Sequence, residues 1–176
     1  KVPPGGSTSL WATGMSYPRD VAFNSSGVLY AVGGYNPMSM YAIPSNGGTG
    51  TLFASQAASS GFACIAFGYL DTARVGGNNT YYDITTAGVV TTFQAFGSGV
   101  DTSDVVYAGN GTFYFLAGGS LYRDVAGNIS TLATGFSNAT SLALVAVPEP
   151  TTTAVAFGVL ALIAVGCTRL RRRSAD

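Results

Sequence analysis

Histidine is absent from this chain of 176 residues, and glutamate occurs once, at Glu149. Histidine is the commonest general base and the commonest metal ligand, so its absence excludes a serine–histidine triad and a histidine-bound zinc. The Gly-x-Ser-x-Gly motif of α/β-hydrolases does not occur either. The sequence therefore predicts no enzyme, and no catalytic, metal-binding or cofactor-binding residue.

Charge is also scarce, because only 9% of the residues are charged and eight basic residues balance eight acidic ones. The basic residues of the segment 1–147 are well separated: Lys1, Arg19, Arg74 and Arg123. Phosphate backbones are bound by clustered basic side chains, so we expect no nucleic-acid partner. The hydrophobic content of 47% is still sufficient for a buried core.

Helix-forming charged residues are few, whereas the chain has 24 Gly, ten Tyr and ten Phe. Aromatic residues favour strands, and Gly, Asn and Ser favour tight turns, so this composition predicts an all-β body. The two cysteines, Cys64 and Cys167, are too few for a disulfide framework.

The body repeats about every 40 residues. Each repeat begins with a short apolar strand, in turn Asp20–Phe23, Cys64–Phe67, Asp104–Tyr107 and Ser141–Leu144. A second strand ends in a glycine pair, at Gly33-Gly34, Gly76-Gly77 and Gly118-Gly119. A third strand carries Tyr and a fourth follows a glycine turn. Four short strands per repeat predict the blades of a β-propeller.

Three blades are expected, at residues 17–56, 61–99 and 100–135 of a repeat domain spanning 1–147. Residues 10–12 match the outer strand of an earlier blade, and residues 136–147 match the inner strand of a later one. We therefore expect further blades upstream of this chain, since a closed propeller needs at least four. The alternative is an open β-meander or a sandwich of the same strands.

Throughout the body we expect only antiparallel sheets, with about three to five residues per strand, and the C-terminal helix as the one helix of the chain. The first strand should be buried on both faces, and Asp20 and Asp104, which share one repeat position, should brace its start. The glycine pairs should allow the second strand to turn where side chains would collide.

The segment Tyr17–Tyr30, with the sequence YPRDVAFNSSGVLY, resembles the NHL and SMP-30-type propellers, and looser matches extend over 17–144. The second repeat departs from the pattern at Gly68–Asp71. The resemblance implies a propeller that binds partners on its faces. The alternative that it leaves open is a lactonase or lyase relative, whose catalytic blades lie upstream and whose metal ligands are acidic residues and Asn.

The C-terminal segment differs in character from the body. No charge occurs over the 19 residues from Pro150 to Thr168, which predicts a transmembrane helix at about 151–168. A stop-transfer cluster follows, made of Arg169, Arg171, Arg172 and Arg173. Positive flanks stay in the cytoplasm, so the body should lie outside the inner membrane. A buried core helix is the alternative interpretation.

The tail 148–176 resembles the PEP-CTERM sorting signal of Gram-negative bacteria, with Pro148, Glu149 and Pro150 first, then the hydrophobic span and the arginines. The resemblance implies recognition by exosortase, a membrane transpeptidase that removes the tail. It also implies export to the cell surface or extracellular matrix, with exopolysaccharide as a candidate partner. A plain tail anchor with a proline hinge is the alternative.

Two weaker site hypotheses concern the body. Four aspartates could gather around calcium, namely Asp71, Asp83, Asp101 and Asp104, although no dense acidic run supports this. Three aromatic residues are candidate sugar platforms, Trp11, Tyr35 and Tyr69, unless they are buried or edge aromatics.

Overall fold

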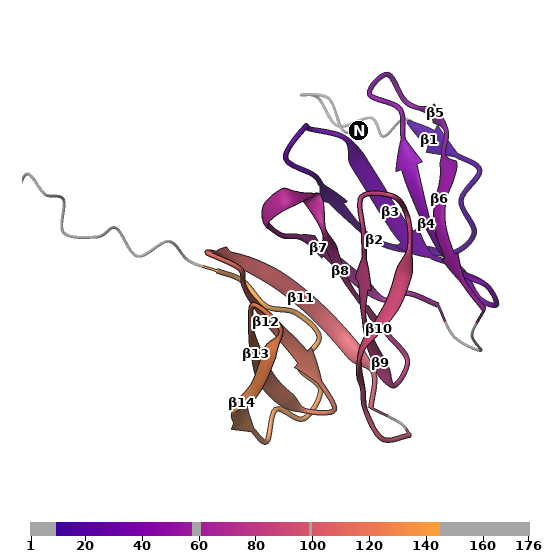
Figure 1. The fold of residues 1–176 in the computed structure, drawn as a ribbon. Coiled ribbons are helices and arrows are strands. Elements are labelled where there is room, and N and C mark those ends of the chain that lie inside the picture. The colour runs from indigo at the N-terminus through magenta and orange to yellow at the C-terminus, as the bar shows by residue number, and fades with distance from the viewer. Residues whose placement is uncertain (1–9, 58–60, 99, 145–176) are drawn as a thin grey trace, which may run out of the picture. The chain divides into compact units, whose positions relative to one another are not determined.

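The computed structural model describes residues 10–57, 61–98 and 100–144, which form three four-stranded antiparallel sheets (Figure 1). The strands of each sheet pair in chain order. The first sheet contains β2 (Pro18–Phe23), β3 (Leu29–Gly33), β4 (Met38–Ile43) and β6 (Thr51–Gln56). The second contains β7 (Cys64–Phe67), β8 (Ala73–Gly77), β9 (Thr80–Ile84) and β10 (Val90–Ala95). The third contains β11 (Thr102–Gly109), β12 (Thr112–Ala117), β13 (Ser120–Val125) and β14 (Asn128–Thr134). The predicted all-β body is confirmed.

Each sheet falls within one of the three predicted blade ranges. The predicted transmembrane helix at 151–168, the Pro148–Pro150 motif and the arginine cluster 169–173 lie outside the described residues. They remain predictions.

The N-terminal strand β1 (Ala12–Thr13) pairs in parallel with β5 (Gly48–Thr49), which lies in the connection from β4 to β6. The prediction of purely antiparallel pairing was therefore wrong. The assignment of residues 10–12 to an earlier blade stays a prediction. Glycine makes this pairing possible, because a Cβ on Gly47 would lie 2.3 Å from the carbonyl oxygen of Trp11. The Gly48 N–H donates to that same oxygen at 2.8 Å.

Several strands are longer than the predicted three to five residues: β11 has eight and β14 has seven. The pairing of β11 with β12 shifts register twice, between Thr102 and Asp104 and between Tyr107 and Gly109. Each β-bulge adds a residue to one strand without ending the pairing, which a count of alternating residues does not reveal.

The helical element of the described residues is a three-residue 3₁₀ turn, η1 (Tyr69–Asp71). It occurs where the second repeat departs from the sequence pattern, and Leu70 and Asp71 adopt left-handed conformations there, with φ of 63° and 59°. No helix within residues 10–57, 61–98 and 100–144 is both long enough and apolar enough to cross a membrane.

Two apolar cores lie between successive sheets. The core between the first and second sheets includes Val32, Met40, Phe62 and Val75, and that between the second and third includes Cys64, Tyr81 and Phe115. The inner strand β7 lies beside both β2 and β11, and its first three residues are buried. In β2, by contrast, Val21 is 55% exposed and Phe23 is 65% exposed. Burial on both faces therefore holds for β7, which has a described sheet on each side, and was wrong for β2.

The glycine pairs act as predicted at the ends of β3 and β8. A Cβ on Gly33 would lie 2.1 Å from the carbonyl oxygen of Tyr17, and one on Gly76 would lie 2.4 Å from Cys64 Sγ. Both distances are far below van der Waals contact. Glycine therefore permits the second strand to lie against the start of the inner strand.

Asp20 and Asp104 brace the inner strands, and each also reaches the following repeat. Asp20 Oδ1 accepts the N–H of Val21 at 2.8 Å, while its Oδ2 accepts the N–H of Ile65, in β7, at 2.8 Å. Asp104 repeats this arrangement with Val105 at 2.8 Å and Leu142 at 2.6 Å. We call these two aspartates the inner-strand staples. The second staple fixes Leu142 at the position that the repeat predicts for a further inner strand.

Cys64 occupies the staple position of the second repeat, where its Sγ lies 3.8 Å from the carbonyl oxygen of Thr102. Arg74 of β8 connects the second and third sheets instead. Its Nη1 lies 2.6 Å from Asp83 Oδ1, and its Nε lies 3.1 Å from Oδ2 of Asp124 in β13. An ion pair therefore joins the two sheets at the junction where the staple aspartate is missing.

Tyr81 carries a buried hydroxyl without a hydrogen-bond partner among the described residues. Burial, and secondarily the charge of Asp124, raises the pKa of this phenol. Unfolding exposes the phenol to water, where it ionises near pH 10, while the folded state keeps it neutral. The free energy of unfolding is therefore unaffected by this phenol below about pH 10. Above that pH it falls as the unfolded chain ionises, by up to about 1.4 kcal/mol per pH unit.

We expect Tyr81→Phe to leave the free energy of unfolding at pH 7 unchanged or to raise it by up to about 1 kcal/mol, since an unpaired buried hydroxyl disappears. Above pH 10 the variant should lose less stability than the unchanged protein does. Urea unfolding at pH 7 and pH 10.5 measures both effects, with the exposed Tyr69→Phe as control. A loss of more than about 1 kcal/mol at pH 7 would show that the hydroxyl is bonded.

Candidate binding site

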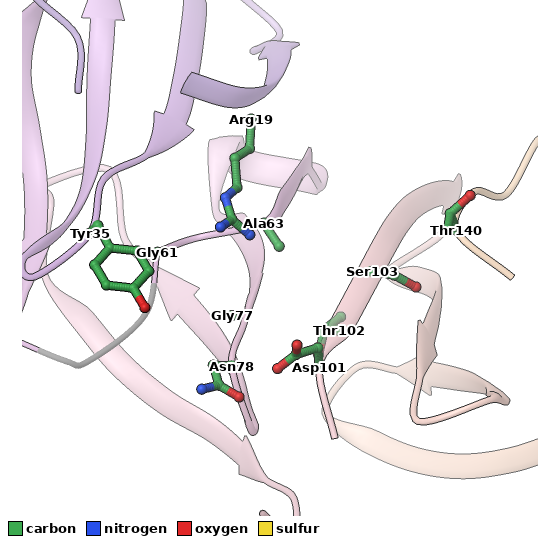
Figure 2. A pocket seen from close by; sticks show the side chains of 10 residues that line it. All are labelled: Arg19, Tyr35, Gly61, Ala63, Gly77, Asn78, Asp101, Thr102, Ser103 and Thr140. Carbon is green, nitrogen blue, oxygen red and sulfur yellow. The ribbon is translucent and has the colours of Figure 1, made fainter. Parts of the chain in front are cut away.

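A cavity of about 510 Å³ lies where the inner strands of the three sheets begin (Figure 2). Its walls come from all three sheets and from the segment before Ser141. The described residues that line it are Arg19, Tyr35, Gly61, Ala63, Gly77, Asn78, Asp101, Thr102, Ser103 and Thr140.

The repeat explains why these residues meet. One residue from each repeat directly precedes the start of the inner-strand motif, namely Arg19, Ala63, Ser103 and Thr140. Two more lining residues, Tyr35 and Asn78, directly follow a glycine pair. Equivalent positions of neighbouring repeats thus face one cavity. Four of these residues were not predicted as site residues, although the aligned repeats contain this signal: Arg19, Asn78, Ser103 and Thr140.

The lining is polar and nearly balanced in charge. Among its described residues, Arg19 is the cation and Asp101 is the anion. An isolated antiparallel bridge joins Asn78 to Asp101, and Figure 2 shows the Asn78 amide and the Asp101 carboxylate directed into the space between them. Thr102 is fully buried, so its Oγ1 is not open to a ligand. The polar side chains of Arg19, Asn78, Asp101 and Thr140 are at least partly exposed, and they offer hydrogen-bond donors and acceptors.

A second hollow of about 600 Å³ adjoins this cavity and shares Arg19 and Tyr35 with it. Its other described lining residues are Tyr17 and Pro18. Tyr17 is 74% exposed and Tyr35 is 65% exposed. The site thus combines a polar cavity with an aromatic hollow.

Of the predicted aromatic platforms, Tyr35 lies in the site. Tyr69 is 74% exposed on η1 but belongs to neither lining described above. Trp11 lies against the turn at Gly47, whose Cβ would be 2.8 Å from the indole Nε1. Tyr17, which was not among the predicted platforms, lines the hollow because it directly precedes Pro18 and Arg19.

The structure does not bring the four candidate calcium ligands together. Asp71 accepts hydrogen bonds from the backbone N–H of Ser25 at 2.8 Å and its hydroxyl at 3.0 Å. Asp83 pairs with Arg74, Asp104 is a staple, and Asp101 lines the cavity. Within residues 10–57, 61–98 and 100–144, no group of three His, Cys, Asp or Glu side chains could hold a metal ion.

Comparison with known proteins gives no matching family model and no matching curated protein. Among solved structures, the chain is similar to virginiamycin B lyase from Staphylococcus aureus, with 20% identity and a TM-score of 0.57. The match covers 66% of this chain and 41% of the lyase. Two structures of the extracellular domain of BT4673 from B. thetaiotaomicron match with 17% identity and a TM-score of 0.52. Each of these two matches covers 71% of this chain and 17% of the BT4673 chain.

The chain therefore spans less than half the length of each of these proteins. The neighbours are of β-propeller type, and at these identities the likeness concerns the fold alone. It favours the propeller over the meander and the sandwich. The described body is thus an all-β, propeller-type array of three four-stranded sheets.

Proposed function

We propose that this chain is an exported bacterial protein of the cell envelope or extracellular matrix, with a non-catalytic binding module as its body. The observation that carries the binding role is the cavity to which equivalent positions of successive repeats contribute. Folds alone do not determine function, so the site and not the propeller supports this proposal.

The tail supplies the sorting part of the proposal. Pro148 and Pro150 lack backbone N–H donors, and Pro150 disfavours helical backbone angles at Glu149, so this peptide should stay extended and accessible to exosortase. Residues 151–168 hold the chain in the inner membrane before processing, and the four arginines keep the C-terminus in the cytoplasm. The body then lies outside the cytoplasm and reaches the cell surface or matrix after cleavage. The BT4673 structures are extracellular domains, so this fold occurs outside cells in another protein.

Mass spectrometry of the mature protein from its native host tests the sorting role. We expect the mature chain to lack the residues after the Pro-Glu-Pro site, and Glu149→Ala to accumulate unprocessed chain, because the substitution removes the carboxylate while both prolines keep the backbone extended. Asp176→Asn is the matched control, since it changes the other carboxylate of the tail and should be processed normally. A mature surface pool that ends at Asp176 would refute sorting by cleavage.

The second candidate function is a propeller enzyme related to lactonases or lyases. Asn78 and Asp101, which face each other in the cavity, are of the residue types that SMP-30-type hydrolases use as metal ligands. Two such residues are fewer than a catalytic metal site requires, so this candidate needs ligands from further blades.

A further inference from the structure

We infer that the cavity and the adjoining aromatic hollow form one binding site for a neutral oligosaccharide or polysaccharide. This inference rests on the proposed binding function of the body. The two spaces share Arg19 and Tyr35, so a ligand longer than one sugar unit can occupy both. Together they provide the two kinds of contact that a sugar ring needs.

The first kind is an apolar surface for the C–H face of a pyranose ring. Tyr17 and Tyr35 expose most of their side chains on one hollow, together with Pro18. Tyrosine offers a rigid apolar ring with a polar hydroxyl, and burying the ring against a ligand is favourable. Two exposed tyrosines on one concave surface are thus matched to a ligand with alternating apolar faces and polar edges.

The second kind is a set of hydrogen-bonding groups that match hydroxyls. The Arg19 guanidinium and the Asn78 amide donate, the Asp101 carboxylate accepts, and the Thr140 hydroxyl does both. The Ser103 hydroxyl, which donates to the carbonyl oxygen of Ala139 at 3.3 Å, can accept. Sugar hydroxyls also donate and accept, so they suit this mixed lining. A phosphate or polyanion does not, because Arg19 is the one described cation of the lining and Asp101 would repel it.

The aromatic hollow is held in place by the backbone. The N–H of Gly34 donates to the carbonyl oxygen of Ser16 at 2.8 Å, which ties the segment of Tyr35 to that of Tyr17. Tyr17 and Asn36 adopt left-handed conformations, with φ of 44° and 52°. Such conformations cost about 1–3 kcal/mol for a residue other than glycine and persist where the surrounding structure fixes them. The backbone that carries both tyrosines is therefore fixed before a ligand binds, which lowers the entropy cost of binding.

The repeats separate the roles of two adjacent positions. The staple position is Asp in two repeats because it holds the next inner strand. The preceding position, which lines the cavity, is Arg, Ala, Ser or Thr in the four repeats. Side chains that differ so much at equivalent sites are not required for packing. They are free to determine which hydroxyls of the sugar are recognised.

A glycan array probed with the full-length chain tests the inference, followed by calorimetry with the best ligand. The panel contains neutral oligosaccharides, among them maltohexaose, cellohexaose and mannohexaose, and the anionic oligogalacturonate. We expect a neutral oligosaccharide to bind, and Tyr35→Ala and Tyr17→Ala each to weaken its affinity at least about tenfold, which corresponds to about 1.4 kcal/mol. Asn78→Ala should weaken binding as well.

Tyr69→Ala is the matched control, because Tyr69 is as exposed as Tyr17 but lines neither the cavity nor the aromatic hollow. The affinity of this variant for the glycan should stay unchanged. Circular dichroism of each variant shows whether it folds, and Tyr35→Phe retains the ring if Tyr35→Ala does not fold. The inference is wrong if no neutral glycan binds the folded protein, if only oligogalacturonate binds, or if Tyr69→Ala weakens binding as much as Tyr35→Ala. The proposed sorting function would survive each of these outcomes, because the mature C-terminus tests it separately.

Discussion

Arg74→Met is expected to lower the free energy of unfolding by about 3–5 kcal/mol, the cost of leaving a buried charge without its partner. Asp124 is fully buried, and its Oδ2 lies 3.1 Å from Arg74 Nε. Its Oδ1 accepts the N–H of Gly127 at 2.8 Å, which alone does not offset the desolvation of the carboxylate. Methionine is unbranched like the aliphatic part of arginine, so the variant removes the charged group and keeps most of the apolar stem.

The guanidinium also makes aromatic contacts that an ammonium group would not reproduce. Its Cζ lies 4.0 Å from the ring centroid of Phe93 and 5.5 Å from that of Phe113. A planar guanidinium can stack on a ring and donate to two carboxylates at once. We therefore expect Arg74→Lys to restore part of the lost stability and not all of it.

Urea unfolding of the full chain, followed by circular dichroism, measures these differences. Arg123→Met is the matched control, because Arg123 lies on the same strand as Asp124 but is exposed, and its loss should be below about 0.5 kcal/mol. The double variant Arg74→Met with Asp124→Asn should be more stable than Arg74→Met alone, since it removes the unpaired charge. Equal stability of Arg74→Met and Arg123→Met would contradict the buried ion pair.

The sequence predicted the fold through its repeat because each strand pairs with the next strand of its own blade. Local patterns such as Leu29–Gly33 determine those pairings, and the close approach of Tyr17 to Gly33 confirms why the glycine pair is there. The parallel pairing of β1 with β5 was not predictable in this way. It joins segments distant in the chain through the Gly47–Gly48 turn, and nothing in the alternation of residues 10–12 encodes its direction.

The site was predictable in part. Tyr35 was selected for its aromatic character, whereas Arg19 and Ser103 were missed because each is unremarkable in its own repeat. Their role comes from the equivalence of positions around one cavity, which requires the arrangement of the three sheets. The partnership of Arg74 with Asp124 was missed for a similar reason, since the two residues lie in different sheets and are 50 residues apart.

Asp104→Ala is expected to lower the free energy of unfolding by about 2 kcal/mol and to release the segment around Leu142. A hydrogen bond to a charged group contributes about 1.5–3 kcal/mol, and the partial exposure of Asp104 places the expected loss at the lower end. The carboxylate joins the N–H groups of Val105 and Leu142, so its removal leaves both amides without that acceptor. Asp20→Ala should act in the same way on Val21 and Ile65.

Amide hydrogen exchange separates a staple from a general loss of stability. In Asp104→Ala the protection of the Leu142 amide should fall by at least about tenfold while that of Ile65 stays, and in Asp20→Ala the pattern should be reversed. Asp101→Ala is the matched control, because Asp101 is an exposed aspartate three residues before Asp104. If Asp101→Ala exposed Leu142 equally, or if Asp104→Ala left its exchange unchanged, the carboxylate would not be what holds this segment. A selective loss at Leu142 would show that one aspartate per repeat fixes the start of the next inner strand, and that the missing aspartate at Cys64 is why the second junction depends on Arg74.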